Sequence, residues 1–105
     1  MDKKLVLQAK KHDKEAFVKL VENYQVSMYK TAIAILQNDE DAADAIQETI
    51  LICWEKIGSL RNAKFFKTWM TRILIHRCYA IYNENKRTVT ADNFPDVMDC
   101  SDKYG

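Results

Sequence analysis

The sequence predicts an all-α fold: a small bundle of three long helices, preceded by a short N-terminal helix and followed by an acidic tail. Apolar residues recur every three or four positions over most of the chain, which is the period of an amphipathic helix. Only two glycines and one proline occur in 105 residues, too few for the turns of a many-stranded β fold. The length fits one domain, and hydrophobic residues make up 48% of it, enough for a core.

Two helices are expected in the first third of the chain. Leu5 and Ala9 are spaced for a short leading helix. Asp13 is placed to cap the start of a long helix, and Glu15 in its first turn interacts favourably with the helix dipole. The apolar stripe of this helix comprises Phe17, Leu20, Val21, Tyr24, Met28, Ala32, Ile35 and Leu36.

A third helix is expected directly after the second. Asn38 or Asp39 can cap its start, and Gly58 with Ser59 ends it. Its apolar side chains recur at helical spacing, so they are expected to share the face that packs against the core. That stripe comprises Ala42, Ile46, Thr49, Ile50, Cys53 and Ile57.

The last long helix is expected over residues 65–86, after a loop over residues 60–64. The helical period is lost after Arg87, and the remaining residues are acidic and include the only proline. We therefore expect a helical domain over residues 1–87 and a flexible acidic linker over residues 88–105. One face of the last helix carries Phe66, Trp69, Met70, Ile73, Arg77, Ala80 and Ile81.

The net charge of +1 hides a strong separation of charge along the chain. Residues 37–55 hold six acidic side chains and no lysine or arginine. Residues 61–87 hold seven bases and one acid, and residues 88–105 hold four aspartates against one lysine. An acidic helix followed by a basic one indicates two different partners, and the basic helix is a candidate for binding a polyanion.

Groups that could carry catalysis or bind a metal are few. Asp41, Asp44 and Glu48 share one helix face, but no glutamate has a histidine three residues later, the spacing of carboxylate metal bundles. His76 and Cys78 lie two positions apart, which directs them to different sides of a helix. No glycine-rich phosphate loop is present. We therefore expect no enzyme, no metal and no cofactor, and the alternative for the acidic face is a solvated surface.

Cysteine usage and hydropathy favour a cytoplasmic protein without membrane insertion. Cys53, Cys78 and Cys100 are odd in number and widely spaced, with no CxxC pair. Each is expected to act as a small core residue. No apolar run approaches the roughly 20 residues that span a bilayer, and no basic-then-apolar signal segment opens the chain.

The basic segment has a more specific interpretation than the acidic one. Arg61, Lys64 and Lys67 lie in or beside the expected loop, next to Phe65 and Phe66. Cations neutralise phosphates, and exposed aromatic rings stack on unpaired bases with about 1–3 kcal/mol per base. The alternative is that Phe66, and less readily Phe65, fills the core under the loop while the bases only solubilise the surface.

Three segments of the chain resemble bacterial sigma factors. Residues 38–48 (NDEDAADAIQE), followed by Trp54, resemble the second conserved region of these proteins. Residues 66–73 (FKTWMTRI) resemble the segment that melts DNA and reads the minus-ten element, and residues 15–24 resemble the start of the same domain. The spacing is that of the small extracytoplasmic-function (ECF) group of the sigma-70 family, and the resemblance covers residues 13–87.

This resemblance implies a region 2 domain that binds core RNA polymerase and recognises and melts the minus-ten promoter element as a single strand. It implies that the acidic helix meets the clamp coiled coil of the largest polymerase subunit, and that an anti-sigma factor regulates the protein. A second DNA-binding domain is also implied and is absent, which favours a truncated chain. The candidate polymerase-binding residues are Asp41, Asp44, Gln47, Glu48 and Leu51.

The resemblance also implies that the loop captures a flipped base and that the following helix reads its neighbours. Ile50 stands where the family often has phenylalanine, a conservative core change. His76 stands where it often has asparagine, which leaves the base preference at that site open. Arg72, His76, Tyr79 and Asn83 are three or four residues apart and therefore share a helix face. The candidate DNA-binding residues are Arg61, Asn62, Lys64, Lys67, Arg72, His76, Tyr79, Asn83, Lys86 and Arg87.

Two other classes of function stay open at this point. The first is a helical protein–protein adaptor without nucleic-acid binding. The second is a helix-turn-helix repressor, which requires two shorter helices joined by a tight turn, whereas residues 64–87 have the pattern of one long helix. Salt-dependent binding to single-stranded promoter DNA separates a sigma factor from an adaptor.

Overall fold

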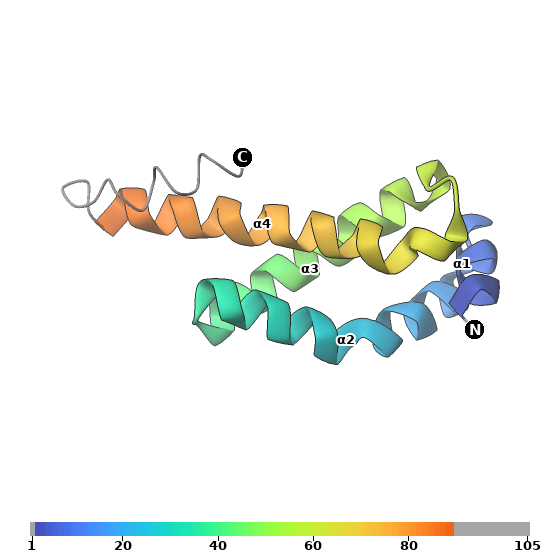
Figure 1. The fold of residues 1–105 in the computed structure, drawn as a ribbon, viewed down its shortest axis with the longest axis horizontal. Coiled ribbons are helices and arrows are strands. Elements are labelled where there is room, and N and C mark those ends of the chain that lie inside the picture. Colours follow the sequence, from blue (N-terminus) through green and yellow to red (C-terminus); the bar gives the residue numbers. More distant parts are fainter. Residues whose placement is uncertain (1, 90–105) are drawn as a thin grey trace.

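A computed structural model describes residues 2–89 and the side-chain surroundings as far as Lys86. The elements are all helical, as Figure 1 shows. Their order confirms the predicted all-α fold of one short and three long helices. The helices are α1 (Asp2–Lys10), α2 (Lys14–Leu36), α3 (Asp39–Lys56) and α4 (Phe66–Val89), with two short 3-10 turns, η1 (Ile57–Ser59) and η2 (Ala63–Phe65), between α3 and α4.

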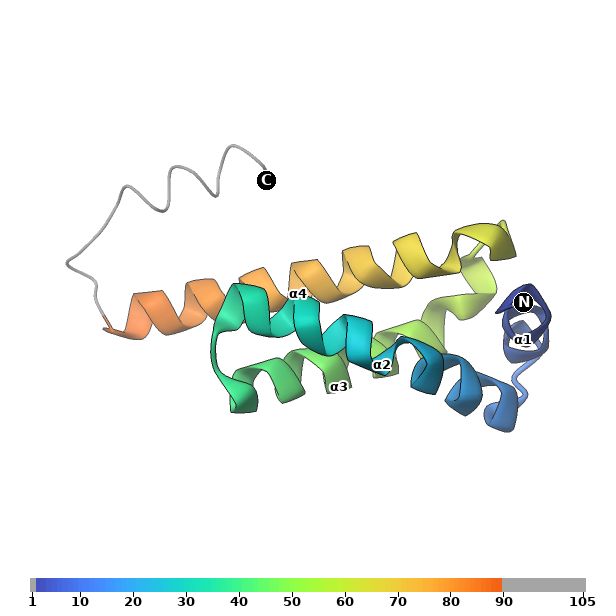
Figure 2. The same ribbon diagram turned by 60° about the horizontal axis from the view of Figure 1, so that its bottom comes forward.

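The three long helices pack against one another in every pairing, and α1 lies across one end of the bundle (Figure 1). There α1 contacts α2 and both 3-10 turns. At the opposite end, the last turns of α4 extend beyond α2 and α3, an overhang that is also clear in Figure 2.

Polar side chains set the helix starts where the sequence predicts them. Asp13 caps α2, because its Oδ1 accepts a hydrogen bond from the N–H of Ala16 at 3.2 Å. Of the two candidate caps for α3, Asn38 fills the role, and its Oδ1 accepts from the N–H of Asp41 at 2.9 Å. Between them, Gln37 adopts a left-handed conformation (φ 55°) that closes α2.

The end of α4 differs from the expected boundary. The helix continues through Val89, three residues beyond the expected end at Lys86. Neither glycine nor proline occurs between Arg87 and Pro95, so no helix-breaking residue directly follows Arg87. Thr88 and Val89 are therefore helical, and the rest of the expected linker, residues 90–105 with Cys100, lies outside the described residues.

Small and branched side chains together fill the core of the bundle. In α3 the buried positions are Ala42, Ala45, Thr49 and Cys53, whereas Ile46 and Ile50 are only partly buried. Alanines at the centre of this face permit the close approach of α2 and α4. The sequence-based stripe omits Ala45, although it lies three residues after Ala42 and four before Thr49 on the buried face. The larger buried side chains around these positions are Phe17, Leu20, Met28, Ile57, Phe66, Met70 and Leu74.

The buried face of α4 is rotated slightly from the predicted one. Its fully buried positions are Phe66, Met70, Leu74 and Cys78, each four residues from the last. The expected face was wrong about Ala80, which is exposed, because no residue from 79 to 86 is buried where α4 begins to overhang. Trp69, Ile73 and Ile81 are partly buried beside this line, Arg77 is partly exposed, and Leu74 was not anticipated.

The two described cysteines behave as the core residues that the sequence predicts. Cys53 and Cys78 are buried free thiols. Burial raises the pKa of the Cys53 thiol to about 12 and that of Cys78 to about 11. Both are therefore protonated and unreactive at neutral pH. None of the helices between Asp2 and Val89 is long and apolar enough to cross a membrane.

Candidate polymerase and nucleic-acid interfaces

The five candidate polymerase-binding residues lie along one side of α3. Asp44 and Gln47 are exposed, while Asp41 and Glu48 are half-buried. Leu51 is 60% exposed. An exposed leucine beside acidic side chains resembles the apolar centre and polar rim of a protein interface.

Two of these acidic side chains already bind α4. Glu48 Oε1 accepts a hydrogen bond from Arg77 Nε at 2.9 Å and forms an ion pair with a terminal nitrogen of Arg77, also at 2.9 Å. Asp41 Oδ2 accepts from Asn85 Nδ2 at 2.8 Å. These partners lie 29 and 44 residues away in the chain, so the sequence alone does not indicate them. The outward-directed part of the acidic face is therefore Asp44, Gln47 and Leu51.

The connection between α3 and α4 is an exposed cationic loop anchored by two buried residues. Leu60 and Ala63 are buried, whereas Arg61, Asn62 and Lys64 are exposed. Residues 63–65, expected partly as loop and partly as helix, form the 3-10 turn η2.

Asn62 stabilises the turn that presents this loop. Its Oδ1 accepts a hydrogen bond from the N–H of Lys64 at 2.9 Å, and its backbone carbonyl accepts from the N–H of Phe65 at 2.9 Å. The side-chain oxygen is thus occupied by the turn itself. A ligand would meet the amide nitrogen of Asn62, which is a hydrogen-bond donor.

Two adjacent phenylalanines at the start of α4 have opposite surroundings. Phe66 is 1% exposed and packs against Tyr24 and Trp69, with ring centroids 5.8 and 5.9 Å away. Phe65 is 53% exposed, and Lys64 Nζ lies 5.9 Å from its ring centroid. Phe66 therefore belongs to the core, and Phe65 offers an aromatic face to a ligand. Phe65 was missing from the candidate list, although an aromatic residue between loop cations was the available signal.

The candidate DNA-reading face of α4 is exposed over its first three positions. Arg72, His76 and Tyr79 are all exposed. Asn83 is half-buried, and its Oδ1 is buried without a hydrogen-bond partner in the described part of the chain. Tyr79 is accessible to a flat ligand, because it is 44% exposed and meets Tyr82 edge-on at 6.5 Å.

The remaining candidate DNA-binding residues lie near the start and the end of α4, and their surroundings differ. Lys67, just after the loop, is exposed. Lys86 is half-buried, with Nζ 5.3 Å from the Tyr82 ring centroid. Arg87 lies on the described backbone of α4, but its side chain lies outside the described residues.

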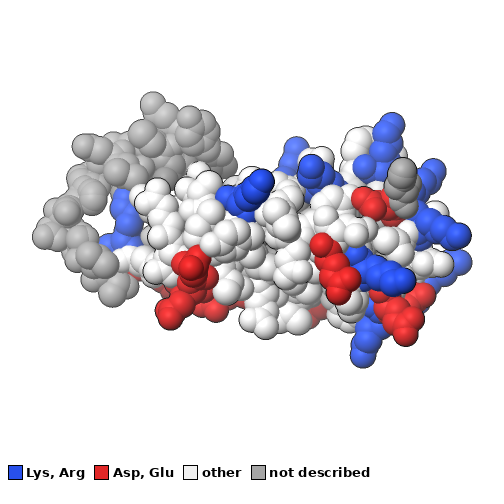
Figure 3. Space-filling view, turned by 90° about the horizontal axis from the view of Figure 1, so that it is seen from below, with Lys and Arg blue, Asp and Glu red and all other residues white. Residues whose placement is uncertain are grey.

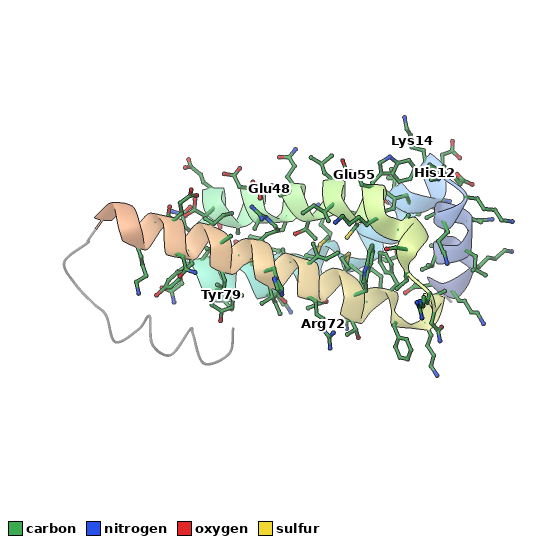
Figure 4. All side chains as sticks on the ribbon, turned by 90° about the horizontal axis from the view of Figure 1, so that it is seen from above. His12, Lys14, Glu48, Glu55, Arg72 and Tyr79 are labelled. Carbon is green, nitrogen blue, oxygen red and sulfur yellow. The ribbon has the colours of Figure 1, made fainter. Side chains whose placement is uncertain are left out.

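The acidic and cationic–aromatic residues occupy different sides of the molecule. In Figure 4, Glu48 and Glu55 lie on one edge along α3, and Arg72 and Tyr79 project from the opposite side along α4. Among residues 2–89, no three His, Cys, Asp or Glu side chains are grouped closely enough to hold a metal ion. The fold and these two surfaces define a helical binding domain with separate acidic and cationic–aromatic sides.

Comparison with known proteins identifies the family. Residues 20–88 match the sigma-70 region 2 family. This chain therefore belongs to the sigma-70 region 2 family, as the segments at residues 38–48 and 66–73 predicted.

The relatives that this chain matches are named as RNA polymerase sigma factors. The ECF RNA polymerase sigma factor SigW of Bacillus subtilis is 34% identical over 73 residues, which is 70% of this chain and 39% of that protein. The RNA polymerase sigma-H factor of Pseudomonas aeruginosa is 31% identical over 75 residues, 71% of this chain and 39% of that protein. SigV of B. subtilis is 23% identical over 87 residues, 83% of this chain and 52% of that protein. This chain thus spans between 39% and 52% of the length of these relatives.

A solved structure supports the fold independently. It is described as the NMR structure of the complex formed by an engineered region 2 of sigmaE with GTAAAA. The two folds agree with a TM-score of 0.74 at 24% identity, over 86% of this chain and 95% of the other.

Proposed function

We propose that this chain is the region 2 part of an ECF-group sigma factor, a non-enzymatic transcription initiation factor that acts in the cytoplasm. In this role it binds core RNA polymerase and recognises and melts the minus-ten element of selected promoters. The observation that carries the proposal is the separation of two surfaces on one small bundle. Family membership and the names of the curated relatives support it.

In this proposal the loop between α3 and α4 holds an unpaired base. Phe65 supplies a ring for stacking, and the amide nitrogen of Asn62 donates to the edge of the base. Arg61, Lys64 and Lys67 neutralise the neighbouring phosphates, which positions the strand without reading it. The binding of GTAAAA by the engineered region 2 supports a single-stranded ligand of this kind.

The exposed part of α4 then reads adjacent bases. Arg72, His76 and Tyr79 follow one another at steps of four and three residues and therefore share a face of α4. Figure 4 shows Arg72 and Tyr79 on the same side of that helix. Arginine and histidine donate hydrogen bonds to base edges, and Tyr79 can stack. Asn83 and Lys86 are half-buried and would reach a strand only near the end of this face.

The acidic side of α3 is the proposed polymerase contact. Leu51 would be buried at its centre, and Asp44 and Gln47 would form the rim against a basic surface such as the clamp coiled coil of the largest subunit. Glu48 contributes indirectly, because its carboxylate already binds Arg77. An anti-sigma factor would inhibit the protein by covering this surface or the cationic one, and competition with core polymerase tests that proposal.

A pull-down with core RNA polymerase tests the assignment of the acidic side. Asp44→Lys reverses the charge of an exposed residue and should leave folding intact while abolishing retention of the chain. Glu22→Lys makes the same charge change on the exposed surface of α2 and should bind like the parent. If Asp44→Lys is retained like the parent, the polymerase contact lies elsewhere. If the parent binds polymerase but no DNA, the adaptor alternative is correct.

A further inference from the structure

Helix α1 is fixed beside the loop that is proposed to hold the unpaired base. At one end of α1, Lys10 Nζ donates a hydrogen bond to the carbonyl oxygen of Leu60 at 2.6 Å. At the other end, the Asp2 carboxylate accepts from the hydroxyl of Tyr24. The Tyr24 ring in turn packs against Phe66, the first residue of α4. Since α1 also contacts both 3-10 turns, it forms one surface with the loop.

This surface is strongly positive. Residues 2–14 hold five lysines against two aspartates, and residues 60–67 hold three bases and no acid, so each segment carries a net charge of +3. Both aspartates are engaged, since Asp2 accepts from Tyr24 and Asp13 caps α2. In Figure 3 lysine and arginine side chains gather at the end of the molecule where α1 lies.

We infer that α1 is a second nucleic-acid contact of this chain, and the inference rests on the proposed function of the loop. Lys3 and Lys4 are exposed on α1. With Arg61 and Lys64 of the loop and Lys67 of α4 they form one surface, which we call the cationic end. Lys3 and Lys4 bind phosphates of the strand that leaves the loop.

A nucleic-acid strand explains the cationic end better than an acidic protein does. The exposed Phe65 ring lies within it, and the ring can stack on a base while the surrounding cations bind the adjoining phosphates. Lysines act on phosphates as flexible point charges, so α1 would add affinity and salt dependence without choosing the promoter.

The test is the salt dependence of binding to a labelled single strand about 16 nucleotides long with GTAAAA at its centre, measured by fluorescence anisotropy. The variant Lys3→Gln/Lys4→Gln removes two exposed charges from the cationic end. Each phosphate contact to a single strand contributes about 0.7 to the slope of log K against log salt, so the slope should become shallower by about 1.4. Its matched control, Lys19→Gln/Lys30→Gln, removes two charges from exposed positions of α2 and should keep the parental slope.

The possible results separate this inference from the proposed function. If Lys3→Gln/Lys4→Gln keeps the salt slope of the parent, and strand binding by the parent depends on Phe65, then only the role of α1 is overturned. A parent chain that does not bind the strand overturns both proposals. Lost polymerase binding with an unchanged slope assigns the lysines to a protein contact and also overturns the inference. Lys3→Arg/Lys4→Arg keeps the charges and should restore the parental slope.

Discussion

Two adjacent phenylalanines at the junction of the loop and α4 differ in burial, and burial decides whether each contributes to binding or to stability. Phe65 and Phe66 have the same side chain, but Phe65 is exposed while Phe66 fills the core between Tyr24 and Trp69. Exposed aromatic rings cost little to remove, whereas a buried ring leaves a cavity. This pair therefore provides a matched comparison of the two roles.

The two phenylalanines should respond in opposite ways to truncation. Phe65→Ala should change the free energy of unfolding by less than about 0.5 kcal/mol and weaken binding to a single strand by about 1–3 kcal/mol. Phe66→Ala should lower the free energy of unfolding by about 3–5 kcal/mol. Urea denaturation and fluorescence anisotropy measure the two quantities. Unchanged strand affinity in Phe65→Ala would remove the stacking role from this ring.

The buried thiols predict a loss of stability at alkaline pH. Burial raises the pKa of Cys53 to about 12 from 9.0. Below pH 9 the thiol is protonated in both states; above it the unfolded chain loses its proton first, so stability falls as pH rises towards the folded pKa. Each such thiol contributes a slope of about 1.4 kcal/mol per pH unit in that window.

Urea denaturation of the parent and Cys53→Ala across this pH range measures the effect. The variant should start less stable, because it loses buried volume, but its stability should decline less steeply above pH 9. The tyrosines and the other cysteines are present in both proteins and serve as the internal control. Equal pH slopes would show that Cys53 is accessible to solvent in the folded state.

At the scale of elements, local sequence signals set where the helices begin, and contacts distant in sequence set how they face each other. Asp13 and Asn38 are caps that the sequence identifies directly. In contrast, the pairing of Glu48 with Arg77 joins residues 29 apart. Their side chains are 46% and 37% exposed, so this pair contributes only about 0–1 kcal/mol and mainly orients α3 against α4.

The start of α3 should be sensitive to its cap. Asn38→Ala removes the acceptor for the N–H of Asp41 and should lower the free energy of unfolding by about 0.5–2 kcal/mol. Asn38→Ser retains a capping oxygen and should recover most of that loss. Thermal denaturation followed by circular dichroism compares the three proteins. Equal stabilities would mean that water satisfies the first turn of α3 as well as Asn38 does.

The sequence predicts the elements better than it predicts the exposed surface of the site. Helical period and caps give the four helices, because both are local properties of the chain. The centre of the buried α4 face was placed too close to Trp69 and Arg77, since period alone cannot show which neighbours bury a helix. The choice between Phe65 and Phe66 likewise depends on Tyr24, which is distant in sequence. The roles of the candidate site residues remain predictions.

At the scale of the whole molecule, the acidic and cationic–aromatic surfaces lie on different sides. We therefore expect core polymerase and a single DNA strand to bind independently of each other. Arg72 and Tyr79 lie on the side away from Glu48 and Glu55 (Figure 4). A single strand should therefore leave the chain attached to core polymerase, and a ternary complex should form. Adding a labelled strand to the immobilised chain–polymerase complex measures this. Displacement of the chain by the strand would show that the two partners share a surface.

The overhang of α4 beyond α2 and α3 gives the molecule a gradient of local stability. Between residues 79 and 86 side chains such as Ile81 are at most partly buried, so this stretch opens at a lower cost than the part of α4 that holds Leu74. Amide protons there should exchange with deuterium before those around Leu74, and fraying should begin at the C-terminal end. A promoter strand that docks on Tyr79 would then complete the folding of its own binding surface. Part of the binding energy would be spent on that ordering, which would make recognition weaker but more readily reversible.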